Sequence, residues 1–285
     1  MKLWVTFVVI YGILKGAREP IKKKILGDVN VLTTLFAYSA VGFIMVAPFS
    51  VGIFDIPIDI FMLVLLKSAS IVVAWLMMFE SIKHVPVSIY GITDSSRVIF
   101  STLMGVLFFK ETLKLLGVVS LLLVAFGLFL ANYKKRAGSN AEKYEIKYVF
   151  IIMLGCLLNA VSGTLDKYLM STGKITESAM QFWFMLTMAA MYLLCIVLRR
   201  EKFEIKKAIK NPWIYALSLF LVVGDRLLFM ANSDPESLVT VMTLIKQSST
   251  VVTIILGKVV YKEKNMIRKF ISAAIIITGI MISVL

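Results

Sequence analysis

Residues 86–133 read PVSIYGITDSSRVIFSTLMGVLFFKETLKLLGVVSLLLVAFGLFLANY, two apolar segments joined by a short charged corner. The same plan returns near the end of the chain, where the corner reads YKEKNM (261–266). Five residues recur at an offset of 152 positions: Gly105, Lys110, Glu111, Gly127 and Ser96 reappear as Gly257, Lys262, Glu263, Gly279 and Ser248. Two copies of one hairpin of membrane length indicate a duplicated integral membrane protein.

The composition indicates the same class of protein. The chain is 59% hydrophobic with a mean hydropathy of +0.89, which is too apolar for one soluble domain of 285 residues. A net charge of +14 is compatible with nucleic-acid binding. However, most of the Lys and Arg lie in short loops between apolar runs, which is the pattern of a membrane topology signal. We therefore expect a lipid bilayer around the chain and no nucleic-acid partner.

The apolar runs predict an all-α polytopic membrane protein with ten transmembrane helices. The hydrophilic linker 134–147 separates a first repeat, 1–133, from a second repeat, 148–285. Because each repeat holds five spans, an odd number, the second repeat must enter the membrane inverted. The predicted spans are 3–26, 30–49, 59–82, 86–109, 113–133, 148–171, 176–198, 212–232, 236–260 and 266–285.

The loop charges predict the orientation in the membrane. Loops on one face hold roughly twenty Lys and Arg, whereas loops on the other face hold roughly four. The positive-inside rule then places loops 134–147 and 199–211 in the cytoplasm and both termini outside. We expect a multi-pass protein of the cell (plasma or inner) membrane in this orientation.

Charged residues inside the apolar spans are the candidate site. Each costs about 2.5–3.5 kcal/mol at mid-membrane on insertion scales, so it should face a cavity or a partner. Asp94 and Lys246 occupy equivalent positions of helices four and nine, and we expect them to form an ion pair. The predicted substrate-binding residues are Glu19, Tyr90, Asp94, Arg97, Asn159, Asp225, Arg226, Lys246 and Thr250.

Two further expectations concern charges near helix ends and breaks. Pro20 interrupts the first helix, and Glu19 beside it should pair with Lys15 or Arg18. Asp166 and Lys167 lie close to a helix end, so we expect them to reach the membrane interface. An alternative for all these charges is that they form buried ion pairs that fix helix register.

The two closing hairpins carry a family resemblance. They read FFKETLKLLG…AFGLFLAN (108–117, 125–132) and VVYKEKNMIRK…IITGIMIS (259–269, 276–283). This pattern resembles the drug/metabolite transporter superfamily, in particular its EamA-type members. The resemblance implies that Glu111 and Glu263 are corner residues of the hairpins rather than substrate ligands. Such proteins often have a proline midway along helices four and nine, where this chain has Arg97–Val98 and Ser249–Thr250. They are also usually drawn with cytoplasmic termini, opposite to the orientation that the loop charges favour.

No enzyme signature is found in the sequence. The single histidine, His84, lies at a loop, so neither a zinc site nor a His-based triad is readily built. No GxxxxGK phosphate loop is present, which argues against direct use of ATP. We expect no enzyme activity, no cofactor and no metal.

These features favour a secondary transporter that moves a small polar metabolite by alternating access. Its central site would lie between helices one, three, four, six, eight and nine. The spans hold five acids and seven bases, and this positive surplus favours an anionic or zwitterionic substrate. Two alternatives stay open: a flippase for a lipid-linked sugar or phospholipid headgroup, and a non-transporting membrane protein with structural ion pairs. The sequence does not determine whether the chain forms a homodimer.

Overall fold

The computed structural model describes residues 3–50, 53–109, 115–132, 144–171, 173–234, 236–237, 242, 245–263 and 266–282. Throughout these ranges the regular structure is helical, which confirms the predicted all-α class. Glu111, Thr243 and residues 134–143 of the predicted linker lie outside the described residues.

Five of the described helices are long and apolar enough to cross a membrane. They are α2 (Val31–Val46) with the short 3-10 helix η1 (Ala47–Phe49), α3 (Ile58–Ile82), α7 (Ile146–Ser171), α8 (Glu177–Arg199) and α10 (Pro212–Ser233). The others are shorter or carry charges: α1 (Leu3–Ile25), α4 (Val87–Asp94), α5 (Arg97–Phe109), α6 (Leu115–Asn132), α9 (Ile205–Lys210), α12 (Ser248–Tyr261) and α13 (Met266–Ile282).

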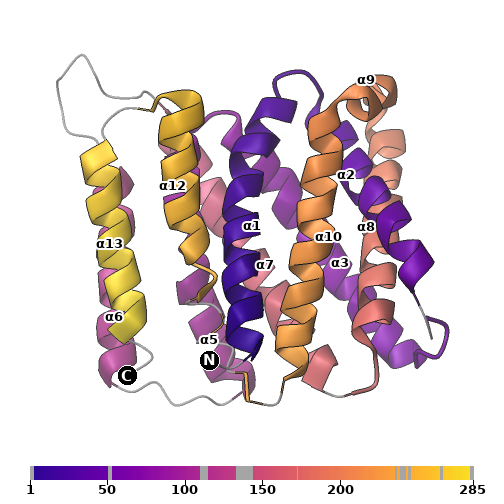
Figure 1. Cartoon of the computed structure of the whole chain (residues 1–285), viewed down its shortest axis with the longest axis horizontal. Coiled ribbons are helices and arrows are strands. Elements are labelled where there is room, and N and C mark those ends of the chain that lie inside the picture. The colour runs from indigo at the N-terminus through magenta and orange to yellow at the C-terminus, as the bar shows by residue number, and fades with distance from the viewer. Residues whose placement is uncertain are drawn as a thin grey trace.

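The long helices run side by side in one bundle (Figure 1). The start of α1 and the end of α13 lie at the same end of this bundle, and α9 lies at the opposite end (Figure 1). The described ends of the chain thus lie on one side of the bundle.

Helix contacts repeat between the two halves of the chain. α1 packs against α10 and α12, and the corresponding helix of the second half, α7, packs against α3 and α5. Likewise α2 packs against α10, and α8 packs against α3. Two of the remaining major contacts join equivalent helices: α2 with α8, and α6 with α13. The main helix contacts of one half are thus repeated in the other.

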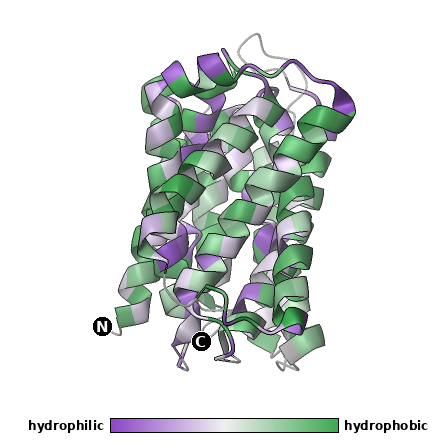
Figure 2. Cartoon of the chain, turned by 90° about the vertical axis from the view of Figure 1, so that its right-hand side faces the viewer, coloured by the Kyte–Doolittle hydropathy of each residue, from purple (hydrophilic) through white to green (hydrophobic). Residues whose placement is uncertain are grey.

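The outer surface of the bundle is apolar. Large side chains such as Leu107, Leu115 and Ile267 are 70–80% exposed. Figure 2 shows hydrophobic residues along the sides of the helices and hydrophilic residues gathered mainly at the end that carries α9. Large apolar side chains exposed along the sides of the helices are explained by contact with lipid.

Helices four and nine are broken, whereas the sequence predicted continuous spans over 86–109 and 236–260. α4 ends at Asp94 and α5 begins at Arg97, with a turn at residues 95–96. In the second half a turn at residues 246–247 precedes α12. Both turns use i to i−3 hydrogen bonds, such as Ser96 N to Thr93 O at 2.9 Å and Thr250 N to Gln247 O at 2.9 Å. Such 3-10 stretches inside helices often mark hinges, and here they form without proline.

The repeated glycines allow α6 and α13 to pack closely. A Cβ atom added at Gly127 would lie 2.5 Å from Ile276 and 3.0 Å from the Ser272 carbonyl. A Cβ at Gly279 would lie 2.7 Å from Leu123 and 3.0 Å from the Ser120 carbonyl. Without side chains at these two positions the helix backbones approach each other, as small residues allow in membrane bundles.

The corner residue Glu263 caps a helix of the other half. Its carboxylate accepts hydrogen bonds from the backbone N–H groups of Val87 at 2.6 Å and Ser88 at 3.2 Å, and from the Ser88 hydroxyl. Lys269 pairs with the same carboxylate at 3.1 Å. Glu263 thus satisfies the free donors at the start of α4 and fixes α12 and α13 against the first half.

Candidate functional site

A polar cavity lies inside the bundle, between the two halves. It has a free volume of about 100 Å³, and both broken helices reach its wall. This is space for only a few water molecules. Its charged lining residues are Lys15, Arg18, Glu19 and Lys22 of α1, Lys67 of α3, Asp94 of α4, Arg97 of α5, Asp166 of α7, Asp225 of α10 and Lys246 before α12.

The cavity brings together seven of the nine predicted site residues. These are Glu19, Tyr90, Asp94, Arg97, Asn159, Asp225 and Lys246. The other two lie elsewhere. Thr250 is buried at the crossing of α4 and α12, where its hydroxyl contacts Ser95 Oγ at 2.9 Å and the Gly91 carbonyl at 3.2 Å. Arg226 lines a separate groove, because it follows Asp225 by one residue and so points to a different side of α10.

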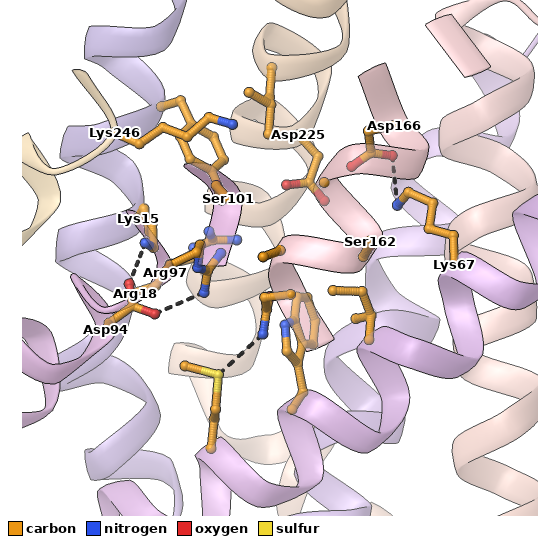
Figure 3. Close-up of a pocket in the computed structure, with 18 of the residues that line it drawn as sticks. Lys15, Arg18, Lys67, Asp94, Arg97, Ser101, Ser162, Asp166, Asp225 and Lys246 are labelled. Carbon is orange, nitrogen blue, oxygen red and sulfur yellow. Dashed lines mark hydrogen bonds and ion pairs between the residues drawn. The ribbon is translucent and has the colours of Figure 1, made fainter. Parts of the chain in front are cut away.

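Asp94 is the centre of the first charged cluster. Its carboxylate pairs with Lys15 of α1 and, at 2.8 Å, with Arg97 at the start of α5 (Figure 3). The thiol of Cys156 approaches the same carboxylate at 3.5 Å. The predicted ion pair between Asp94 and Lys246 is therefore wrong in this conformation. The helix break places Arg97 and α1 places Lys15 against the acid, and both lie closer than the equivalent residue of the second half.

The second half of α1 supplies one charged face to the cavity. Lys15, Arg18, Glu19 and Lys22 recur at spacings of three, one and three residues, which place them on adjoining positions of one helix face. Glu19 pairs with Lys22 at 2.8 Å, so the prediction that it pairs with Lys15 or Arg18 is wrong. Arg18 donates to the Tyr38 hydroxyl at 3.2 Å, and Lys15 is held by Asp94.

Lys67 and Asp166 form the second buried ion pair, across α3 and α7. Their charged atoms are 3.1 Å apart, and the Lys67 ammonium lies 3.2 Å from the centre of the Phe184 ring. The prediction that Asp166 reaches the membrane interface is therefore wrong. Lys167 does point toward the helix end, where it donates to the Ser237 hydroxyl at 2.8 Å.

Three charged groups of the cavity are left outside these ion pairs. Lys246 lies 5.8 Å from the centre of the Tyr11 ring, and within the described ranges no carboxylate is within ion-pair distance of it. Among the described side chains, Arg18 likewise has no carboxylate within ion-pair distance, and Asp225 has no basic group within that distance. In Figure 3, Asp225 lies between the two ion-pair clusters, and Lys246 lies above the cluster of Asp94. With six bases and four acids the lining carries a surplus of positive charge.

Aromatic rings complete the cavity wall, and sequence reasoning did not assign most of them to the site. They are Tyr11, Tyr38, Trp75, Phe79, Phe184 and Phe229. Trp75 and Phe79 stack at 6.3 Å, and Trp75 stacks on Tyr38 at 5.4 Å. The spacing of four residues between Trp75 and Phe79 places both rings on one face of α3, which the sequence alone indicates. Their contact with Tyr38 of α2 depends on how the helices pack.

Among the described residues, the His, Cys, Asp and Glu side chains do not gather into a metal site. No group of three or more His, Cys, Asp or Glu that could hold a metal ion occurs in the part of the chain that the structure describes. His84 lies at the end of α3, contacts Glu80 at 3.2 Å and stacks on Tyr148 at 4.2 Å. Cys156 and Cys195 are both free thiols.

A helical bundle with an apolar exterior and a charged interior cavity defines a multi-pass membrane protein. The model of the EamA-like transporter family matches residues 2–133 and again residues 146–285. The chain therefore belongs to the EamA-like transporter family, which is consistent with the drug/metabolite transporter superfamily that the hairpins resemble.

Comparisons with individual proteins add the fold. A solved structure titled "Crystal structure of protein" is similar over 99% of this chain and 96% of its own, with a TM-score of 0.71 and 15% sequence identity. At this identity the likeness concerns the fold alone. No curated protein matches the chain.

Proposed function

We propose that the chain is a secondary transporter that moves a small anionic or zwitterionic metabolite by alternating access through the central cavity. The observation that carries this proposal is that Lys246 has no carboxylate at ion-pair distance among the described residues, in a cavity with a positive surplus between the two halves. An intramembrane cation without a counter-charge is costly, and an anionic group of a substrate removes that cost.

The architecture we propose is ten spans arranged as a 5+5 inverted repeat. The contact pattern supports it, because α1 with α10 and α12 corresponds to α7 with α3 and α5. Five described helices meet a strict length and hydropathy test, and the broken or charged helices account for the other spans. Breaks at equivalent positions of the two halves, at 95–96 and 246–247, are further support for the duplication.

The two helix breaks are where we expect movement. α4 and α12 cross between the cavity and Glu263, and their turns interrupt the regular hydrogen-bond ladder at the level of Asp94 and Lys246. A substrate anion that binds Lys246 and Arg18 changes the charge balance around Asp94 and Asp225. Rocking of one repeat against the other about this crossing would expose the cavity to alternate sides.

We place the protein in the cell membrane with the end that carries α9 in the cytoplasm. Loop 199–211 with its Lys and Arg cluster lies at that end, and Figure 2 shows the hydrophilic residues gathered there. Both chain ends then face outward.

Binding and transport are tested in two steps. Purified protein is first screened for thermal stabilisation by small carboxylates, phosphates, zwitterions and organic cations. A ligand at 100 times its Kd adds about 2.7 kcal/mol. Counterflow of the stabilising compound is then measured in proteoliposomes. We expect anionic or zwitterionic compounds to stabilise and exchange, and Lys246→Met to abolish both effects while Lys246→Arg keeps part of them.

Lys258→Met is the matched control, because Lys258 lies on α12 but is exposed outside the cavity. It should transport as the unchanged protein does. Stabilisation and exchange of organic cations alone, or normal transport by Lys246→Met, would refute the proposed substrate class. Stabilisation without any exchange would support a membrane protein that does not transport.

A further inference from the structure

Arg226 lies on the outside of the bundle, apart from the central cavity. On α10 it shares one helix face with Leu219, Val223 and Met230, which are 40–48% exposed. Asp225, the preceding residue, lines the cavity. A cationic side chain on a lipid-facing stripe of a membrane helix requires an explanation of its own.

The surroundings of Arg226 form a groove of about 290 Å³. Its walls come from the end of α2 with η1, the first turns of α8 and the second half of α10. Apolar residues make up most of the lining: Met45, Val46, Phe49, Val222, Val223 and Leu227. Phe49 and Val223 are exposed, so the groove opens on the outer surface of the bundle.

The polar part of the groove is small and mostly occupied internally. The Gln181 side chain, 3% exposed, donates to the Val222 carbonyl at 2.7 Å and so joins α8 to α10. Arg226 donates to the Ser178 hydroxyl at 2.9 Å. Within the described ranges no carboxylate lies at ion-pair distance from Arg226. Glu177, the acid beside Ser178, accepts a hydrogen bond from the Ser233 hydroxyl at 2.6 Å and is not in ion-pair contact with Arg226. A guanidinium has five N–H donors, and the Ser178 hydroxyl does not use them all.

The groove lies toward the end of the bundle where α8 begins. Ser178 lies in the first turn of α8, so its hydroxyl is near the start of that helix. The backbone of Arg226 lies about two turns before the last residue of α10. Its side chain extends to the Ser178 hydroxyl, as long cationic side chains extend toward the membrane surface. The guanidinium thus lies near one end of the bundle, and the apolar walls of the groove extend from it toward the middle of the helices.

We propose that this groove binds a phospholipid, whose phosphodiester contacts Arg226 and Ser178 and whose acyl chain lies along Phe49 and Val223. Arginine matches the two non-bridging oxygens of a phosphate with paired N–H groups. The apolar walls and the opening toward lipid favour a lipid over a soluble anion. The negative charge of the phosphate matches the positive charge of Arg226. Because the groove lies at the end of the bundle where α8 begins, the phospholipid belongs to the leaflet at that end. The site is independent of the substrate cavity.

Lipid binding is measured by native mass spectrometry of the purified protein titrated with phosphatidylglycerol. We expect one tightly retained lipid, and its affinity should fall about tenfold or more in Arg226→Met, since a hydrogen bond to a charged group contributes at least about a factor of ten. Arg199→Met is the matched control, because Arg199 is an exposed arginine on α8 at the other end of the bundle. It should keep the retained lipid.

A second variant keeps the test decisive if Arg226→Met fails to fold. Val223→Trp fills the groove from its exposed edge and leaves the guanidinium in place, and it should also lose the lipid. Normal retention in either folded variant overturns the proposal, as does an equal loss in Arg199→Met. Displacement of the lipid by millimolar inorganic phosphate alone would show an anion site instead, and would equally overturn it.

Discussion

Replacing Asp94 by Asn is expected to destabilise the protein strongly. The change keeps the size of the side chain and removes one negative charge from a cluster that also holds Lys15 and Arg97. The Asp94 side chain is 6% exposed, and those of Lys15 and Arg97 are 7% and 17% exposed. Two buried cations then face each other without the carboxylate between them.

The magnitude follows from burial. Removing one partner of a buried ion pair costs about 3–5 kcal/mol, because the remaining charge stays desolvated. The chain provides a comparison in Glu80, which also contacts two bases, Lys83 at 3.0 Å and His84 at 3.2 Å. The Glu80 side chain is 48% exposed, so Glu80→Gln should cost about 0–1 kcal/mol.

Thermal unfolding of the purified variants measures the difference. At about 2–4 °C per kcal/mol, Asp94→Asn should lower the Tm by roughly 6 °C or more and Glu80→Gln by roughly 4 °C at most. Adding Lys15→Met to Asp94→Asn removes one of the two stranded cations and should restore part of the loss. A Tm for Asp94→Asn within the range of Glu80→Gln would refute the view that the Asp94 cluster is a desolvated, stabilising unit.

Three other predictions test the fold and the orientation. A single cysteine at Lys206 should resist a membrane-impermeant thiol reagent in intact cells, whereas a single cysteine at Asp55 should react. Lys206 lies in a basic loop and Asp55 in an acidic loop on the opposite face. The reverse labelling would invert the topology. Glu263→Gln should lower the Tm, because it weakens the cap at the start of α4, which is worth about 0.5–2 kcal/mol, and the ion pair with Lys269 at 3.1 Å; an unchanged Tm would contradict the capping role. Gly127→Val should prevent close packing of α6 and α13 and reduce the yield of monodisperse protein. Gly163→Ala should not reduce the yield, because a Cβ at Gly163 would have no atom within 4 Å. Equal yields would argue against the close contact of α6 and α13.

The sequence determined the class of the protein because hydropathy and duplication are properties of the chain itself. Long apolar runs require a membrane whatever their packing, and the recurrence of Gly105, Glu111 and Gly127 as Gly257, Glu263 and Gly279 records the duplication directly. The family match over residues 2–133 and 146–285 confirms this level of the interpretation. Charges such as Asp94 and Lys246 stood out for the same reason, since each is unfavourable in lipid unless it lines a cavity.

Only the tertiary structure decided which charges meet. Helical periodicity places Asp94, Arg97 and Lys246 on faces, but an ion pair depends on how far apart those faces lie. The turn at 95–96 brings Arg97 to Asp94, the packing of α1 brings Lys15 to the same carboxylate, and Lys246 in the turn at 246–247 lies beside Tyr11. Periodicity places Asp225 and Arg226 on different sides of α10, but only the packing of α10 shows that the first side faces the cavity and the second the outer groove. Partners are set by distances between helices far apart in the chain, and these distances arise from packing that no local pattern encodes.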